Sequence, residues 1–233
     1  MSGTAIVTGG TGGLGSAVVE RLLRDGWRVV VPWIVPEELE RLPDHERLVA
    51  VEADLFQDEA VRQVLATAAS VSDRPIRALV NLVGGFAMGA KVHETPVEEF
   101  ERQFRLNLRP TYLMTAAAVP HLLENELPDR GAIVCVGSRA ALQPFSGAAG
   151  YISSKAAVIA FSQAVATEYR NDGIRCNAIL PSTIDTPGNR ASMPKADHSK
   201  WVQPAQIAGV VAHLVSADAS PISGAAIPVY GRA

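Results

Sequence analysis

The sequence predicts an α/β fold, a doubly wound and mostly parallel sheet of seven strands with helices on both faces. Short apolar segments alternate with longer amphipathic segments along all 233 residues, as expected when each strand is followed by a crossover helix. The apolar segments are almost continuously hydrophobic, which is typical of parallel strands buried on both faces. No repeat, low-complexity run or linker interrupts this alternation. We therefore expect residues 1–233 to form one domain.

Charge and cysteine content narrow the possible partners and compartments. The net charge is −3 and the pI is near 6.0, so the chain has no overall attraction for nucleic acid or anionic lipid. The two cysteines lie in apolar segments and the histidines are scattered without metal-ligand spacing. No apolar run approaches the roughly 20 residues that span a bilayer, and the start shows no signal-peptide pattern. We expect a soluble cytoplasmic protein without a metal, nucleic-acid or membrane partner.

The first predicted strand and helix enclose a glycine-rich turn. Residues 5–7 predict a strand, residues 16–24 predict a helix, and the turn between them is Thr8-Gly9-Gly10-Thr11-Gly12-Gly13-Leu14-Gly15. Glycines let the backbone approach a pyrophosphate, and a helix start supplies free N–H groups and positive potential. In this context the turn predicts a dinucleotide-binding site.

The second predicted strand, residues 27–31, lies where such units distinguish NAD from NADP. An acid near the end of this strand holds the ribose hydroxyls of NAD, whereas NADP users place a basic residue nearby. Here the strand ends in Val31-Pro32-Trp33-Ile34, which contains neither. The sequence leaves the choice of cofactor open, and Trp33 either covers the adenosine or belongs to the core.

The next predicted elements are a helix over 37–42, a strand over 47–51, a helix over 57–69 and a strand over 76–83. Asp54 either caps the helix over 57–69 or accepts a hydrogen bond from an adenine amine. Asn81 interrupts an apolar strand and therefore needs a polar partner. Gly84-Gly85 follows that strand and permits close approach of a ligand.

One long helix is predicted over residues 97–123, followed by a fifth strand over 132–136. Asn107 lies among leucines on the apolar face of this helix. Because asparagine is a mediocre helix former, we expect Asn107 to bond either local backbone or a functional group. Ser138 follows the fifth strand, at the end where open parallel sheets bind ligands.

Tyr151 and Lys155 begin the next helix, which extends to about residue 170. Residues four apart lie on one helix face, so we expect the ammonium of Lys155 to lower the pKa of the phenol from its usual value of about 10. A phenol tuned in this way donates or accepts protons. Alone, the pair fits a packing contact equally well.

The last part of the chain predicts a strand over 173–180, a helix over 206–215 and a strand over 224–229. Residues 182–202 between them are polar and irregular. A segment of this length is more typical of a lid or binding loop than of a connector. We expect it to cover the substrate.

Together these motifs resemble the short-chain dehydrogenase/reductase family over nearly all of the chain. They are Thr8-Gly9-x-x-x-Gly13-x-Gly15, Asn81-x-x-Gly84, Asn107, Ser138, Tyr151-x-x-x-Lys155, and Asn177 followed by Pro181. The resemblance implies a Rossmann-type enzyme that transfers hydride between NAD or NADP and a small carbonyl or alcohol substrate. It also implies a homotetramer or homodimer paired through the helices that begin near Val97 and Gly150.

The resemblance also implies a role for each motif. Tyr151 is the general acid or base at the substrate oxygen, and Ser138 orients that oxygen. Lys155 lowers the pKa of the phenol and bonds the nicotinamide ribose, and Asn107 holds a water that links Lys155 to solvent. Cofactor contacts are expected from Thr8, Gly9, Thr11, Gly13, Leu14, Gly15, Trp33, Asp54, Leu55, Asn81, Gly84, Tyr151, Lys155, Pro181, Ile184 and Thr186.

A narrower likeness concerns the substrate side. Gly84-Gly85-Phe86 and the run from Asp185 through Arg190 to Trp201 are similar to dihydropteridine reductases of the same family. Those enzymes have an acid where this chain has Trp33, and they generally lack the catalytic serine, so Ser138 favours a ketone or aldehyde over a quinonoid pterin. Arg190 and Trp201 either line the lid or serve as a surface charge and an anchoring aromatic. A non-catalytic dinucleotide sensor is a further alternative, motivated by the missing ribose-binding residue.

Overall fold

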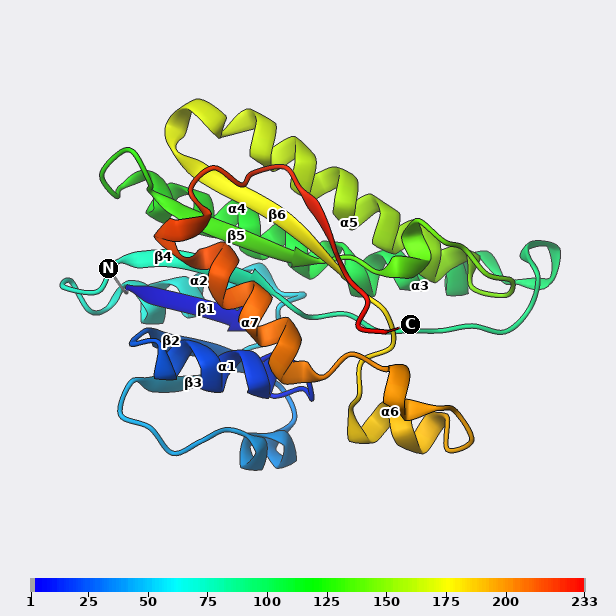
Figure 1. Ribbon diagram of the computed structural model, residues 1–233. Helices are drawn as coiled ribbons and strands as arrows, with labels where there is room; N and C mark the ends of the chain where they lie inside the picture. The colour runs from blue at the N-terminus through cyan, green and yellow to red at the C-terminus, as the bar shows by residue number, and fades with distance from the viewer. Residues whose placement is uncertain (1–2, 233) are drawn as a thin grey trace.

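The computed structural model describes residues 3–232, whose strands form one seven-stranded sheet in the order β3-β2-β1-β4-β5-β6-β7 (Figure 1). All ladders are parallel, so the mostly parallel sheet that the sequence predicts is parallel throughout. The strands are β1 (Thr4–Thr8), β2 (Arg28–Trp33), β3 (Leu48–Glu52), β4 (Ile76–Asn81), β5 (Gly131–Val136), β6 (Ile174–Pro181) and β7 (Ala226–Val229).

Helices cover both faces of this sheet, as predicted. On one face lie α1 (Gly15–Arg24) and α7 (Pro204–Val215). On the other lie α2 (Asp58–Ala69), α4 (Arg109–Leu123) and α5 (Ala149–Glu168), and α3 (Val97–Asn107) packs against α5. Successive residues of β1 serve the two cores in turn, because Ile6 packs on the α2 side and Ala5 and Val7 on the α1 side. Burial on both faces explains why the strands are continuously apolar.

The sheet reverses its winding direction between β1 and β4. These strands are neighbours, although β2 and β3 separate them in the sequence. At such a switch point a crevice opens beyond the carboxyl ends of the strands. The hydroxyl of Thr8 links the two strand ends, because its Oγ1 accepts a hydrogen bond from the Leu82 N–H at 3.1 Å. The glycine turn, Gly84 and Ser138 follow β1, β4 and β5 and therefore share this edge.

The helix predicted over 97–123 is in fact two helices, α3 and α4, that meet at Leu108. Pro110 lies in the first turn of α4. It has no N–H to donate to the carbonyl four residues earlier, so an uninterrupted helix is disfavoured there. The break puts Asn107 at the end of α3 rather than in mid-helix.

The segment over 182–202 is more ordered than the sequence predicts. It contains the helix α6 (Pro187–Ser192) and a 3-10 turn, η5 (His198–Lys200), and a parallel bridge between Ile184 and Val202 closes its base. Trp201 is buried, with its ring 4.3 Å from that of His198, so it serves as an anchor. Arg190 pairs with Asp185 within the segment.

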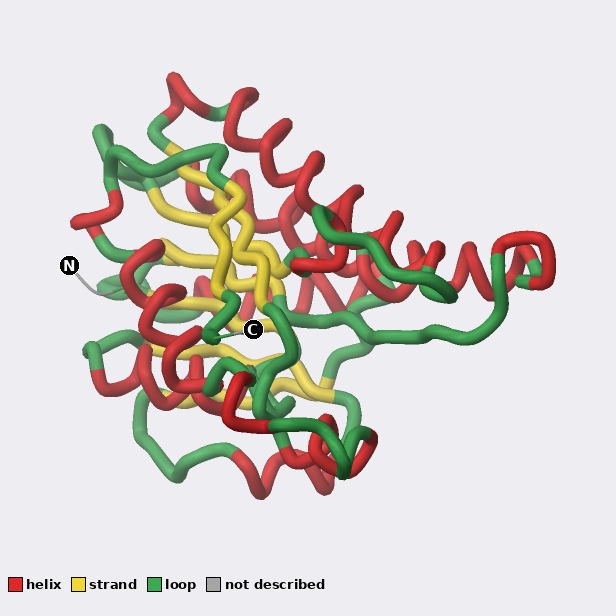
Figure 2. The backbone as a smooth tube through the Cα atoms, turned by 45° about the vertical axis from the view of Figure 1, so that its right-hand side comes forward, coloured by secondary structure: helices red, strands yellow, loops and turns green. Residues whose placement is uncertain are grey.

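The segment between β4 and α3, which includes a 3-10 turn η2 (Val92–Glu94), extends beyond the carboxyl ends of the strands (Figure 2). Within residues 3–232, no helix combines the length and the hydrophobicity that a membrane crossing requires.

Candidate active site

The glycine turn is a tight loop at the start of α1. The N–H of Gly12 donates to the Gly9 carbonyl at 3.1 Å, and Gly9 has a φ of +65°, which favours glycine. A Cβ at Gly15 would lie 2.0 Å from the Gly9 oxygen, so no larger residue fits there. Leu14 offers no side-chain cap to α1, and the Ser16 N–H donates to the Gly12 carbonyl at 2.9 Å, so the turn leads directly into the positive end of the helix. These features fit a pyrophosphate.

The segment after β6 reaches back to this turn. A Cβ at Gly13 would lie 2.9 Å from Cγ2 of Thr186, so glycine leaves room for the Thr186 side chain against the turn. Pro181 ends β6, and the bridge from Ile184 to Val202 fixes the segment that follows. Thr186 therefore lies directly beside the turn, and its contact with the cofactor stays a prediction.

Two residues that the sequence analysis missed, Glu38 and Arg41, also contact the turn. They lie on η1 (Pro36–Arg41), the 3-10 helix found in place of the helix predicted over 37–42. The hydroxyl of Thr11 donates to Glu38 Oε2 at 2.7 Å, and Arg41 donates to the Thr11 carbonyl at 3.2 Å. Glu38 Oε1 and Arg41 Nη1 are 3.1 Å apart. The sequence could have indicated these contacts, because Glu38 and Arg41 both follow β2 within one short helix.

The structure shows the surroundings of four further residues that are expected to contact the cofactor. Asp54 does not cap α2, whose N-cap is Gln57; its Oδ1 accepts the Phe56 N–H at 3.1 Å in a local turn. Leu55 is buried in the core. Asn81 is buried, and its Nδ2 donates to the Thr115 hydroxyl of α4 at 3.2 Å, while its Oδ1 has no hydrogen-bond partner within residues 3–232. Trp33 is half-buried at the end of β2. The core requires an apolar side chain at Leu55 and a polar partner for Asn81.

Ser138, Tyr151 and Lys155 meet where β5 ends and α5 begins. Ser138 is buried, and its side chain lies close enough to Tyr151 to affect the phenol. Burial raises the pKa of Tyr151, and the Ser138 hydroxyl partly opposes this rise. Lys155 is also buried, and its Nζ donates to the Val136 carbonyl at 2.9 Å. Burial lowers the pKa of this ammonium to about 8.

The expected lowering of the Tyr151 pKa by Lys155 is therefore wrong for this structure. Loss of solvation dominates at the phenol, and the ammonium bonds a strand carbonyl instead. An ammonium has three donors, and Lys155 has only this one hydrogen bond within residues 3–232. Its remaining N–H groups fit the hydroxyls of a ribose.

Asn107 joins this group from the break between α3 and α4. Its Oδ1 accepts the Gly85 N–H at 2.9 Å, and its Nδ2 donates to the Ser154 hydroxyl at 3.0 Å. A Cβ at Gly84 would lie 2.6 Å from Asn107 Oδ1 and 3.1 Å from Lys155 Nζ. Gly84 therefore lies beside both the Asn107 amide and the Lys155 ammonium. The water that Asn107 is expected to hold stays a prediction.

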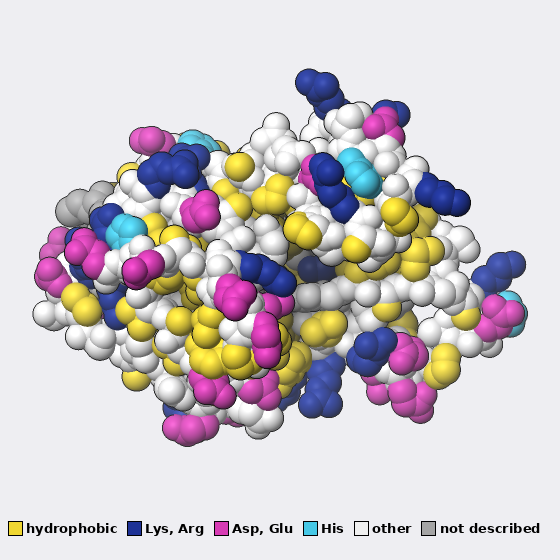
Figure 3. All heavy atoms as spheres, turned by 90° about the horizontal axis from the view of Figure 1, so that it is seen from below, with side chains coloured by type: hydrophobic (Ala, Val, Ile, Leu, Met, Phe, Trp, Pro, Cys, Tyr) yellow, Lys and Arg dark blue, Asp and Glu magenta, His cyan; other side chains and the backbone are white. Residues whose placement is uncertain are grey.

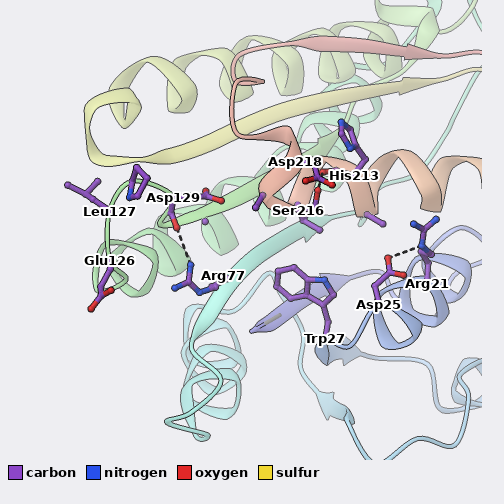
Figure 4. Close-up of a pocket in the computed structure, with 15 residues that line it drawn as sticks. Arg21, Asp25, Trp27, Arg77, Glu126, Leu127, Asp129, His213, Ser216 and Asp218 are labelled. Carbon is purple, nitrogen blue, oxygen red and sulfur yellow. Dashed lines mark hydrogen bonds and ion pairs between the residues drawn. The ribbon is translucent and has the colours of Figure 1, made fainter. Parts of the chain in front are cut away.

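A separate cleft of about 560 Å³ lies near the C-terminal ends of α1 and α7, and none of the predicted site residues lines it (Figure 4). Three of its charged side chains bond within the protein: Arg21 pairs with Asp25 at 2.8 Å, and Arg77 donates to the Asp129 carbonyl at 3.1 Å. Residues 3–232 contain no group of three or more His, Cys, Asp or Glu side chains that could hold a metal ion. Seen from below, acidic and basic side chains are interspersed (Figure 3).

Known proteins share this architecture and sequence. The family model for short chain dehydrogenases matches residues 3–197. The chain is 34% identical to 2-(R)-hydroxypropyl-CoM dehydrogenase of Xanthobacter autotrophicus, over 99% of this chain and 98% of that protein.

Two solved structures with a bound nicotinamide cofactor are also similar. The 3-ketoacyl-(acyl-carrier-protein) reductase of Brucella melitensis, complexed with NADH, has a TM-score of 0.87 and 29% identity, over 99% of this chain and 98% of that one. A blue fluorescent protein from a metagenomic library, complexed with NADPH, has a TM-score of 0.83 and 27% identity, over 98% of this chain and 96% of that one. The chain belongs to the short-chain dehydrogenase/reductase family and is an NAD(P)-dependent oxidoreductase.

Proposed function

We propose that the protein is a carbonyl reductase or alcohol dehydrogenase in which Tyr151 exchanges the proton that accompanies hydride transfer. One observation carries the proposal: Ser138, Tyr151 and Lys155 meet beside Gly84 and Asn107, at the same edge of the sheet as the glycine turn. Bound NAD or NADP supplies the hydride chemistry. The protein orients the substrate and handles the proton.

The protonation states of these groups suit a reduction near neutral pH. Because the pKa of Tyr151 is raised, the phenol keeps its proton and can donate it to a carbonyl oxygen. Ser138 can donate a second hydrogen bond to that oxygen and so stabilise the charge that develops on it. Lys155, with a pKa of about 8, is mostly cationic at pH 7 and can hold ribose hydroxyls. In alcohol oxidation Tyr151 takes up the proton instead.

We further propose how the remaining parts of the chain serve this reaction. Residues 1–233 act as one domain, and residues 182–202 act as a lid, because Thr186 already touches the glycine turn at Gly13. The glycine turn binds the pyrophosphate, and Gly84 and Lys155 border the nicotinamide ribose. The functional unit is a homotetramer or homodimer.

Two alternatives have less support. A dihydropteridine reductase would share Gly84-Gly85-Phe86 and the lid, but Ser138 beside Tyr151 suits a carbonyl oxygen, and the relatives described above are a dehydrogenase and a ketoacyl reductase. A non-catalytic sensor would need the cofactor site but not the converging Ser138, Tyr151 and Lys155.

The substitution Tyr151→Phe tests the proposal. We expect turnover to fall by roughly 10²- to 10⁴-fold, the usual contribution of a general acid, while NADH and NADPH affinity, followed by nicotinamide fluorescence, stays within about threefold. Tyr169→Phe, at the end of the same helix, is the matched control. Near-full turnover in Tyr151→Phe would refute the proposed mechanism, and reduction of quinonoid dihydropterin in preference to every ketone would favour the pterin alternative.

A further inference from the structure

Two exposed phenylalanines lie beside the proposed catalytic tyrosine. The ring centroid of Phe86 is 4.9 Å from that of Tyr151, in an edge-to-face arrangement at 84°. The Phe145 ring is 6.4 Å from Phe86. The two phenylalanines are 57% and 45% exposed, far more than residues that serve the core. Exposed aromatic surface next to a reactive group marks a ligand-binding face.

The loops that carry these rings are tied to each other. Phe86 lies on the loop after β4, and Phe145 on the loop between β5 and α5. The N–H of Gly89 donates to the Gly147 carbonyl at 2.8 Å. Gly147 has a φ of +82°, and a Cβ there would lie 2.7 Å from the Gly89 oxygen, so glycine is required at this crossing. The two rings are therefore held near each other without a ligand, which lowers the entropic cost of binding one.

The stretches of these loops around the two rings carry no charge, and Lys91, His93 and Glu94 lie further along the loop after β4. Neither residues 84–90 nor residues 140–150 include Asp, Glu, Lys, Arg or His. The buried ammonium of Lys155 bonds Val136, and the guanidinium of Arg139 lies over the Tyr230 ring at 5.7 Å. An anionic group placed against these loops would lose its hydration without gaining a partner.

We infer that Phe86 and Phe145 form an aromatic wall that selects uncharged ketones bearing an aryl group, and the corresponding secondary alcohols. A planar substrate ring gains an offset or edge-to-face contact with the wall in addition to apolar burial. The same placement brings the adjoining carbonyl next to the Tyr151 phenol and the Ser138 hydroxyl. This inference rests on the proposed function and assigns its substrate class.

A pair of ketones of similar size, one with an aryl ring and one with a saturated ring, tests the wall. We expect kcat/KM for phenyl methyl ketone to exceed that for cyclohexyl methyl ketone by roughly 2- to 10-fold, the range that one aromatic contact contributes. Phe86→Leu keeps the apolar bulk and loses the ring face, so it should lower the ratio by about the same factor, and Phe145→Leu should also lower it. Met88→Ala is the control, because Met88 lies on the same loop and is 61% exposed but has no aromatic ring to lose. Unchanged circular dichroism and NADH affinity would show that each variant is folded.

The outcomes distinguish the inferred preference for aryl ketones from the proposed carbonyl reduction. An unchanged ratio in both leucine variants, or a higher kcat/KM for acetoacetyl-CoA than for phenyl methyl ketone, would overturn the inference. Turnover of butanone without any preference for the aryl ketone would overturn the inference and leave the proposed function intact. Cofactor binding with no turnover of any carbonyl would overturn both.

Discussion

Lys155 is the residue whose properties depart most from what its motif predicts. Its spacing from Tyr151 predicts an ammonium that tunes the phenol, yet its Nζ bonds the Val136 carbonyl and its own pKa is lowered to about 8. Sequence spacing places the pair on one helix face correctly. It cannot give the sign of the pKa shift at Tyr151, because that sign depends on how much protein surrounds the phenol, and many distant segments contribute to that burial.

The lowered pKa of Lys155 predicts a pH-dependent stability. Between about pH 8 and the usual value of 10.5, the unfolded chain holds a proton that the folded chain has released, so raising the pH through this window stabilises the fold. Relative to Lys155→Met, the free energy of unfolding of the natural protein should rise by about 1 kcal/mol from pH 7 to pH 9. Urea denaturation of both proteins at the two pH values measures this difference. A difference that stays constant would show that Lys155 titrates normally in the folded state.

At the scale of the elements, the sequence predicts strands better than it predicts breaks in helices. All seven strands appear near their expected positions, because a strand buried on both faces leaves an unmistakable apolar run. The division of α3 from α4 was missed, since Phe100, Phe104 and Leu108 continue a helical period across it, and the competing signal is the single Pro110. The contacts of η1 were missed because they depend on how that 3-10 helix folds back onto the glycine turn.

The contact of η1 with the turn predicts a residue that governs the choice of cofactor. A carboxylate at Glu38 repels the 2′-phosphate of NADP and neutralises Arg41, with which it pairs. Glu38→Gln should therefore shift the ratio of NADPH to NADH affinity towards NADPH by roughly tenfold, about one charge-assisted hydrogen bond. Fluorescence titration with both cofactors measures the ratio, and Arg41→Ala should shift it the opposite way. Equal ratios in all three proteins would place the adenosine ribose away from η1.

At the scale of the whole molecule, parallel topology explains why so much of the site could be predicted. In a sheet of this order the carboxyl ends of β1, β4 and β5 are adjacent, so motifs that follow these strands must share one edge. The glycine turn, Gly84 and Ser138 meet for this reason. Sheet topology does not predict the aromatic wall, because Phe86 and Phe145 come together through a crossing of two loops.

A groove on the outside of the molecule bears on its assembly. It has a volume of about 650 Å³ and is lined by Phe56, Phe104, Arg105, Leu108, Arg109, Tyr112 and Phe161. Tyr112 is 55% exposed there, and the groove lies on α3, α4 and α5, which include the helices expected to pair. An exposed aromatic groove of this kind is typical of a protein interface.

We expect Tyr112→Glu to dissociate the oligomer, because the substitution replaces aromatic surface of the groove with a carboxylate that would lose its hydration in the pairing surface. Sedimentation velocity at several concentrations measures the mass. Leu127→Glu is the control, since Leu127 is 58% exposed and lies beside the cleft near the ends of α1 and α7. A natural protein that sediments as a monomer, or an oligomer that survives the Tyr112 substitution, would contradict this expectation.

Asn107 also sets a limit on how the enzyme can change over time. Its one amide accepts from Gly85, at the base of the loop that bears Phe86, and donates to Ser154, which neighbours Lys155 on α5. A substitution at this residue would disturb the substrate loop and the lysine in a single event. Substitutions at the tips of the two loops can therefore change the substrate preference alone. A substitution at Asn107 would alter the position of the substrate loop and the position of Lys155 at the same time.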